Sequence, residues 1–213
     1  MVKAWNKNMI EVFTPGWITC LDESMSIWTN KWTCPGYIFC PRKPHPFGNE
    51  YHSIACGLSS IMFQVEMVEG KDRPKELPCD PKNTKTICLL MRLCKALYGT
   101  GKVVILDSGF CVLQGLIELR KVGVFGSALI KKRRYWPKHV LGSEIDDHFK
   151  DKEIGECDSL QGTLDGVPYD LFCMKEPDYV MKAISTYSGL VVKEGQKDSV
   201  QKYVSGGEMK EKI

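Results

Sequence analysis

The sequence contains no long apolar run, no C-x-x-C pair and no internal repeat. A membrane-spanning helix needs about 20 consecutive apolar residues, so neither such a helix nor a membrane partner is expected. No apolar stretch with a small-residue cleavage site follows Met1, and we therefore expect an intracellular protein. The formal charge is only +3 over 213 residues. A nucleic-acid partner must therefore be argued from local charge clusters.

Cysteine is abundant, with ten residues, a number that would suggest disulfides in a short secreted chain. Several lie among apolar neighbours, where a reduced thiol behaves as a small hydrophobic side chain: Cys20, Cys56, Cys88, Cys94 and Cys111. Cys88 and Cys94 point to different sides of a predicted helix and make a poor pair of metal ligands. We therefore expect reduced cysteines in an intracellular protein.

Hydrophobic residues make up 43% of the chain, enough to fill one sizeable domain or one domain with an inserted subdomain. Apolar patterns and turn signals predict, in chain order, a helix over 3–14, strands over 17–21 and 37–40, a strand or hairpin over 51–58 and 61–69, a helix beginning after Asn83 or Thr84, a strand over 103–106, a helix over 112–121 and a strand over 127–130. Early strands followed by helical crossovers predict an α/β fold with a mixed sheet flanked by helices.

Two apolar patterns predict which residues are buried. The first predicted long helix has an apolar face formed by Ile87, Leu90, Met91, Cys94 and Leu97. The continuous apolar run 103–106 predicts a strand buried on both faces. Beyond residue 135 the apolar runs are shorter, and only 171–174 and 180–184 are predicted to be regular elements.

Two aspartates follow apolar runs that are predicted to be strands: Asp22 follows 17–21, and Asp107 follows 103–106. Two carboxylates held close together repel each other, and a divalent metal removes that conflict. Two Mg²⁺ ions about 4 Å apart can activate a water and stabilise the leaving oxygen in phosphodiester cleavage. If the two strands are neighbours, the pair can form a metal site. The alternative is that both aspartates are structural residues of turns or helix caps.

The residues around these aspartates resemble a known family. Leu21-Asp22-Glu23-Ser24-Met25 is similar to the DE-x-M signature at the first catalytic aspartate of piggyBac-type transposases, and Arg42-Lys43-Pro44-His45-Pro46-Phe47-Gly48 to the family's basic Lys-Pro…Gly segment. Leu106-Asp107-Ser108-Gly109-Phe110, with the basic stretch at 131–137, resembles the second aspartate block. A third match runs from 174–178 to 184–186.

The resemblance implies an RNase H-like catalytic fold with an insertion domain, and a DDD metal site that cuts DNA at transposon ends and joins them to a target. It divides the chain into a remnant of the N-terminal region (1–16), a partial RNase H-like core (17–134), an insertion-like segment (135–190) and a flexible tail (191–213). It also implies Mg²⁺ or Mn²⁺ as cofactor, no small-molecule cofactor, DNA as partner and a nuclear location. A homodimer would form through regions largely outside this chain.

Asp22 and Asp107 match the first two acidic positions of the family. The third aspartate of the family follows the Ser-Thr segment in a Val-Asp-containing motif, and no match to it is found before Ile213. Asp165, Asp170 and Asp178 precede the required place. We therefore expect a truncated transposase core that is inactive by itself, because losing a ligand disturbs the geometry of a two-metal site.

Two basic clusters are candidate DNA contacts. The larger consists of Lys131, Lys132, Arg133 and Arg134, and the smaller of Arg42 and Lys43. The larger cluster could instead be a solvated strand end or a nuclear-import patch. His52, on an apolar strand, is expected to be a packed core histidine rather than a metal ligand. Two functions therefore remain open: a metal-dependent transposase core, or a non-catalytic DNA-binding or interaction module derived from one.

Overall fold

The computed structural model describes residues 1–68, 84–131, 137, 140–187, 200–203 and 209–212. In these residues nine strands form one sheet, in the order β2-β3-β1-β5-β6-β9-β8-β7, with β4 paired to β3. The strands are β1 (Ile18–Ile27), β2 (Tyr37–Phe39), β3 (Phe47–Cys56), β4 (Met62–Met67), β5 (Val103–Leu106), β6 (Phe125–Leu129), β7 (Cys157–Leu164), β8 (Val167–Lys175) and β9 (Val180–Ser185). The helices are α1 (Val2–Val12), α2 (Lys85–Leu93), which continues into the 3₁₀ turn η1 (Cys94–Leu97), α3 (Leu113–Lys121) and α4 (Gly142–His148).

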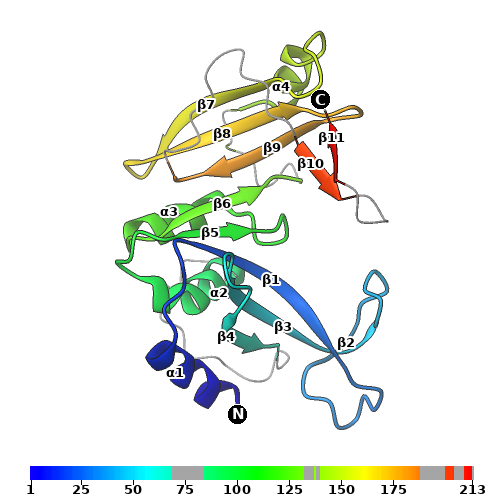
Figure 1. Ribbon diagram of the computed structural model, residues 1–213, viewed down its shortest axis with the longest axis vertical. Coiled ribbons are helices and arrows are strands. Elements are labelled where there is room, and N and C mark those ends of the chain that lie inside the picture. The colour runs from blue at the N-terminus through cyan, green and yellow to red at the C-terminus, as the bar shows by residue number, and fades with distance from the viewer. Residues whose placement is uncertain (69–83, 132–136, 138–139, 188–199, 204–208, 213) are drawn as a thin grey trace.

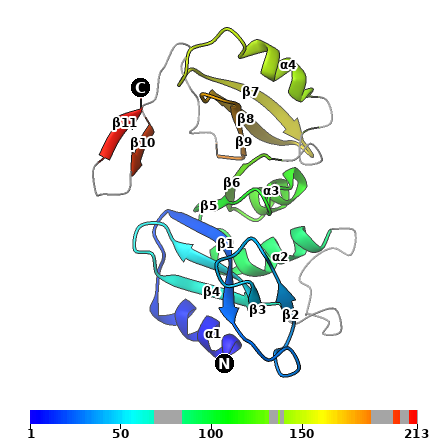
Figure 2. The same ribbon diagram turned by 90° about the vertical axis from the view of Figure 1, so that its right-hand side faces the viewer.

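The N-terminal part of the sheet is mixed, as the sequence predicts. Strands β4, β3 and β1 are antiparallel neighbours, and β5 and β6 then run parallel to β1. Parallel neighbours need a crossover connection, which α3 provides between β5 and β6. Helices α2 and α3 pack against each other on one side of these strands (Figure 2).

The predicted helices form where the apolar pattern places them. All five residues of the predicted face of α2 and η1 are buried, each less than 9% exposed. Helix α3 ends at Lys121 with Val122 as its C-cap, and the next residue, Gly123, has the positive φ of 76° that favours glycine after a helix. The backbone N–H of Val124 then donates to the carbonyl of Leu119, a bond that satisfies one of the last carbonyls of the helix.

Burial of β5 differs from the prediction. Val103, Val104 and Leu106 are buried, but Ile105 is 37% exposed. On the neighbouring strand, Cys20 is paired with Ile105 and is also exposed. Helices α2 and α3 cover only one face of β1 and β5, so the run of apolar residues does not mean burial on both faces. The described residues therefore leave one face of these strands open.

The C-terminal part of the chain contains more regular structure than the sequence predicts. Strands β7, β8 and β9 form an antiparallel meander, and β9 joins the sheet by pairing with β6 (Figure 1). Helix α4 and strand β7 were not predicted. Two further strands, β10 (Val200–Tyr203) and β11 (Met209–Lys212), pair in the segment predicted to be a flexible tail. No helix in the described ranges is long and apolar enough to cross a membrane.

Helix α2 takes part in an ion pair and a disulfide. Arg92 binds both carboxylate oxygens of Glu66 at 2.9 and 2.8 Å, a half-buried bidentate ion pair that fixes the helix to β4. Cys88 is disulfide-bonded, so the expectation of a reduced thiol is wrong at this position. Eight other cysteines are free: Cys20, Cys34, Cys40, Cys56, Cys94, Cys111, Cys157 and Cys173.

Candidate active site

The two aspartates of the predicted metal site lie on neighbouring parallel strands. The pairing of β1 with β5 runs from Ile18 opposite Val103 to Leu21 opposite Leu106. Asp22 and Asp107 are the next residues on each chain. Because adjacent parallel strands keep their register, the two aspartates leave the paired segment side by side. The condition set by the sequence, that the two strands be neighbours, is met.

Asp22 does not end its strand, contrary to the sequence-based expectation. Strand β1 continues to Ile27, and Asp22 lies inside it, opposite Ser53 of β3. The apolar run stops at Leu21 because the partner strand β5 stops at Leu106, whereas the pairing with β3 continues for six more residues to Ile27. Asp107 does directly follow the last residue of β5, as predicted.

Both carboxylates are accessible to solvent and to a ligand. Asp22 is exposed, and its Oδ1 accepts a hydrogen bond of 2.8 Å from the backbone N–H of Glu23. The side chain of Asp107 is 47% exposed, and Ser108 Oγ donates to its Oδ2 at 3.5 Å. Lys131 Nζ lies 3.9 Å from Asp107 Oδ1. An exposed ion pair of this length contributes little stability, so it leaves Asp107 free to exchange partners.

Cys20 lies close enough to both aspartates for their charges to act on its thiol. Burial raises the pKa of the Cys20 thiol above its ordinary value, and the negative charges of Asp22 and Asp107 raise this pKa further. Side chains alternate along a strand, so Cys20 and Asp22 project from the same face of β1. Asp22 therefore lies on the same exposed face of β1 as Cys20.

The two aspartates suit a hard divalent cation. Carboxylate oxygens are the ligands that Mg²⁺ prefers, and this ion is often bound by only one or two carboxylates, with waters and substrate phosphates completing its shell. Among the residues that the structure describes, no group of three or more His, Cys, Asp or Glu side chains could hold a metal ion. The described part of the chain thus brings together two carboxylates that are accessible from solvent.

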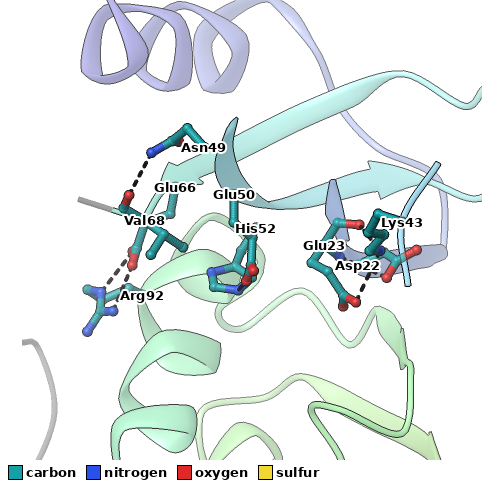
Figure 3. A network of polar contacts seen from close by, with 9 residues as sticks. All are labelled: Asp22, Glu23, Lys43, Asn49, Glu50, His52, Glu66, Val68 and Arg92. Atoms are coloured by element: carbon teal, nitrogen blue, oxygen red, sulfur yellow. Dashed lines mark hydrogen bonds and ion pairs between the residues drawn. The ribbon is translucent and has the colours of Figure 1, made fainter. Parts of the chain in front are cut away.

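A second polar cluster lies on the other face of β1, beside the start of α2 (Figure 3). A cavity of about 360 Å³ is lined there by Glu23, Cys40, Arg42, Lys43, Glu50, His52, Lys85, Thr86, Leu89, Gly109 and Phe110. Lys43 Nζ lies 3.2 Å from Glu23 Oε1 and donates to the Glu23 carbonyl at 3.3 Å. Lys43 therefore fastens the loop after β2 to β1, directly next to Asp22.

His52 differs from the packed core histidine that the sequence suggests. Its Nε2 lies 2.9 Å from Glu50 Oε1, and its ring meets Phe110 edge-on with 5.4 Å between centroids. The hydrogen bond to His52 lowers the pKa of Glu50, and the positive charge of Lys43 adds to this effect. His52 Nδ1 is buried with no hydrogen-bond partner. Sequence reasoning missed this pair, although two polar residues two positions apart on a strand must share a face.

The predicted basic residues do not form one group in the structure. Lys131 lies beside Asp107, whereas Lys132, Arg133 and Arg134 lie outside the described residues. Arg42 and Lys43 line the cavity on the α2 side.

Comparisons with known proteins agree with this architecture. The family model described as Transposase IS4 matches residues 1–212. Among solved structures, a cryo-EM structure of the piggyBac transposase synaptic complex with hairpin DNA matches with a TM-score of 0.71 at 14% identity. The match covers 91% of this chain but 38% of that chain, so this chain spans well under half of that transposase. Similarity at this level shows the fold, and it confirms the predicted mixed sheet flanked by helices.

A second solved structure is much less similar. Endonuclease V of Ciona intestinalis, in complex with a DNA that contains an inosine followed by a ribo-adenosine, matches with a TM-score of 0.34 at 12% identity, over 86% of this chain and 80% of that chain. This likeness is too weak to carry an argument. The search of curated proteins finds no match.

Proposed function

Because the chain belongs to the Transposase IS4 family, and its fold is that of a piggyBac-type transposase, we propose that it is a transposase-derived domain in which Asp22 and Asp107 hold Mg²⁺ or Mn²⁺ for DNA cleavage and strand transfer. The observation that supports the proposal is the register of β1 and β5, whose last pair, Leu21 with Leu106, directly precedes the two aspartates. The family membership alone would not identify the ligands.

Each residue of the site has a distinct part in the proposed chemistry. Metal ions at such carboxylates can activate a nucleophilic oxygen and stabilise the leaving oxygen of a phosphodiester. Asp22 is held by the backbone N–H of Glu23 and by its place inside a paired strand, which fixes one ligand position. Asp107 directly follows the end of β5, so its side chain can change position when it binds a metal ion. Lys131 can move from Asp107 to a phosphate oxygen when DNA arrives.

DNA is the partner that this arrangement suits best. Lys131 would neutralise a phosphate near the aspartates, and Arg42 and Lys43 would contact phosphates from the α2 side of β1. Lys132, Arg133 and Arg134 follow Lys131 in the sequence and add positive charge to the same segment. A chromosomal substrate in turn suggests action in the nucleus. Self-association through regions outside this chain is part of the same proposal.

A second candidate function is a DNA-binding module that keeps the fold without the chemistry. One observation favours it: Lys131 Nζ already approaches Asp107, and a permanent lysine there would replace a metal as the partner of the carboxylate. The two candidates differ in how they depend on the aspartates. Cleavage requires both carboxylates, whereas binding by a non-catalytic module requires only the cations.

The experiment that separates them measures binding and nicking of a supercoiled plasmid by the same chain in Mg²⁺ and in Mn²⁺. Robust nicking is not expected, because the described residues supply only two carboxylates; we expect salt-sensitive binding with at most weak, metal-dependent nicking. Asp22→Asn and Asp107→Asn should each lower nicking by about 100-fold or more while binding remains. Binding without any nicking would favour the non-catalytic module, and absence of binding at low salt would contradict both candidates.

A further inference from the structure

An arm of the sheet extends beyond the parallel strands and carries exposed aromatic side chains. The arm, residues 27–49, contains the outer end of β1, the strand β2, the start of β3 and the loops between them. Strand β5 accompanies β1 only to Leu21, whereas β3 accompanies it to Ile27. Figure 1 shows β1 and β3 running out beyond α2 to these loops. The arm is therefore accessible on several sides.

The composition of the arm suits an anionic partner. From Ser24 to Asn49 the chain contains no Asp or Glu, but it contains the cations Lys31, Arg42 and Lys43. The same stretch contains five aromatic residues: Trp28, Trp32, Tyr37, Phe39 and Phe47. Cations interleaved with aromatic rings and without acids are typical of surfaces that bind single-stranded nucleic acid, where bases stack on rings while cations follow the backbone. A protein partner with an ordinary mixture of charges would gain less from this surface.

The rings are exposed and already arranged for stacking. Phe39 and Phe47 lie opposite each other on β2 and β3, with ring centroids 4.8 Å apart and an interplanar angle of 28°. Their residue exposures are 58% and 48%. Trp32 is 85% exposed, and Lys31 Nζ lies 4.7 Å from its ring centroid. These side chains expose apolar area that nothing in the described chain covers.

Polar contacts keep the arm in shape. Asn30 Oδ1 accepts a hydrogen bond of 3.0 Å from the backbone N–H of Trp32, and Trp28 Nε1 donates to Thr33 Oγ1 at 3.0 Å. The amide of Asn49 donates to the carbonyls of Pro35 and Val68. Ordering the loop before binding lowers the entropy lost on binding, so the exposed rings form a ready surface.

The arm is aligned with the aspartate site. Side chains alternate along β1, so the face that carries Asp22 also carries Ser24 and Ser26 and then reaches Trp28, whose backbone N–H donates to the carbonyl of Phe47. Six residues of strand correspond to about 20 Å at roughly 3.3 Å per residue. A DNA strand held at Asp22 and Asp107 can therefore run along this face to the aromatic rings.

We propose that the arm is a base-stacking site for unpaired nucleotides of DNA, in which Trp32 and the Phe39–Phe47 pair contact base faces while Lys31, beside the Trp32 ring, contacts a phosphate. Base faces are accessible only in single-stranded or unpaired DNA, so the site distinguishes such DNA from a closed duplex. The inference rests on the proposed function, because it takes DNA at Asp22 and Asp107 as its starting point, and it adds which form of DNA the domain holds.

The test is a fluorescence-anisotropy titration of the full chain against a labelled single strand of about 20 nucleotides and against the duplex of the same sequence. Trp32→Ala and the double variant Phe39→Ala/Phe47→Ala should each weaken single-strand binding roughly 5- to 100-fold and leave duplex binding within about twofold. The salt dependence should not change, since no phosphate contact is lost. Trp5→Ala is the matched control, because Trp5 is an exposed tryptophan on α1.

The outcomes separate this inference from the function on which it rests. If the unmodified chain binds DNA and both arm variants bind single strands equally well, the stacking site is wrong and the proposed function stands. Equal losses on single strand and duplex would also overturn stacking on unpaired bases. A dimer of the chain that Trp32→Ala converts to a monomer would show that a second copy covers the arm. If the chain binds neither DNA, the proposed function fails as well.

Discussion

Glu50 and His52 show how charge and burial act on single residues in this fold. Glu50 is a half-buried carboxylate that keeps its charge because His52 binds it and Lys43 lies nearby. The lowered pKa of Glu50 means that the folded state favours the ionised form. Such a carboxyl stabilises the fold at pH values above its pKa in the unfolded chain. This contribution disappears as the pH falls through its pKa in the folded chain.

Replacing this carboxylate should therefore change how stability depends on pH. We expect Glu50→Gln to be less stable than the unmodified chain by about 1 kcal/mol near pH 7, because His52 loses a charged acceptor. Acidification below the ordinary pKa of 4.5 should reduce the difference, and it should vanish once the carboxyl is protonated in both states. Urea unfolding across this pH range measures the effect. Glu11→Gln on the exposed side of α1 is the control, and a difference independent of pH would contradict the account.

At the scale of elements, strand β1 determines the geometry of the site through two partners of different length. Its pairing with β5 places Asp22 beside Asp107, and its longer pairing with β3 builds the arm. Gly48 of β3 lies between β1 and β2 and is paired with both Ile27 and Ile38. A Cβ atom at Gly48 would lie 1.9 Å from the Ser26 carbonyl oxygen.

A side chain at Gly48 should therefore separate the strands of the arm. We expect Gly48→Ala to destabilise the chain by about 3 kcal/mol, because a backbone atom cannot move aside as a flexible side chain can. Gly109→Ala should have little effect, since a Cβ there meets nothing within 4 Å. Hydrogen exchange of β1 and β3 amides measures the change. Unchanged protection in the arm would show that the close approach at Gly48 is not a real constraint.

The elements that could be predicted from sequence are those with a local signal. Helix α2 has a complete apolar face, and the end of α3 has Gly123, so both were found. The length of β1 beyond Asp22 was missed because Asp22-Glu23-Ser24 is polar, and only the pairing with β3 keeps it extended. The exposure of Ile105 was also missed, because composition does not reveal which face of a strand a helix covers. The sequence could not show that the strands before Asp22 and Asp107 are neighbours, because strand order depends on the tertiary structure.

At the scale of the whole molecule, one sheet joins the N-terminal and C-terminal parts of the chain. The junction is the pairing of β6 with β9, from Ser127 opposite Ser185 to Leu129 opposite Ala183. Ser127 Oγ and Ser185 Oγ lie 2.6 Å apart, and the adjacent Ile184 is fully buried. A sheet that is continuous across this junction should transmit a loss of stability from one part to the other.

Ile184→Ala tests this continuity. Removing a fully buried isoleucine side chain costs about 2 to 5 kcal/mol. Four of the five tryptophans lie within residues 5–32, so tryptophan fluorescence reports mainly on the N-terminal part. We expect the unfolding transition followed by fluorescence to shift as far as the one followed by circular dichroism. A shift in circular dichroism alone would mean that the two parts unfold independently.

The central claim is that Asp22 and Asp107 together bind a divalent cation, and Mn²⁺ titration of the full chain followed by electron paramagnetic resonance tests it most directly. The account predicts that the unmodified chain binds Mn²⁺ and that Asp22→Asn and Asp107→Asn each weaken this binding by about tenfold or more. Asp178→Asn, at an exposed aspartate of the β8–β9 connection, should bind as the unmodified chain does. Equal Mn²⁺ affinity in all four proteins would contradict the account.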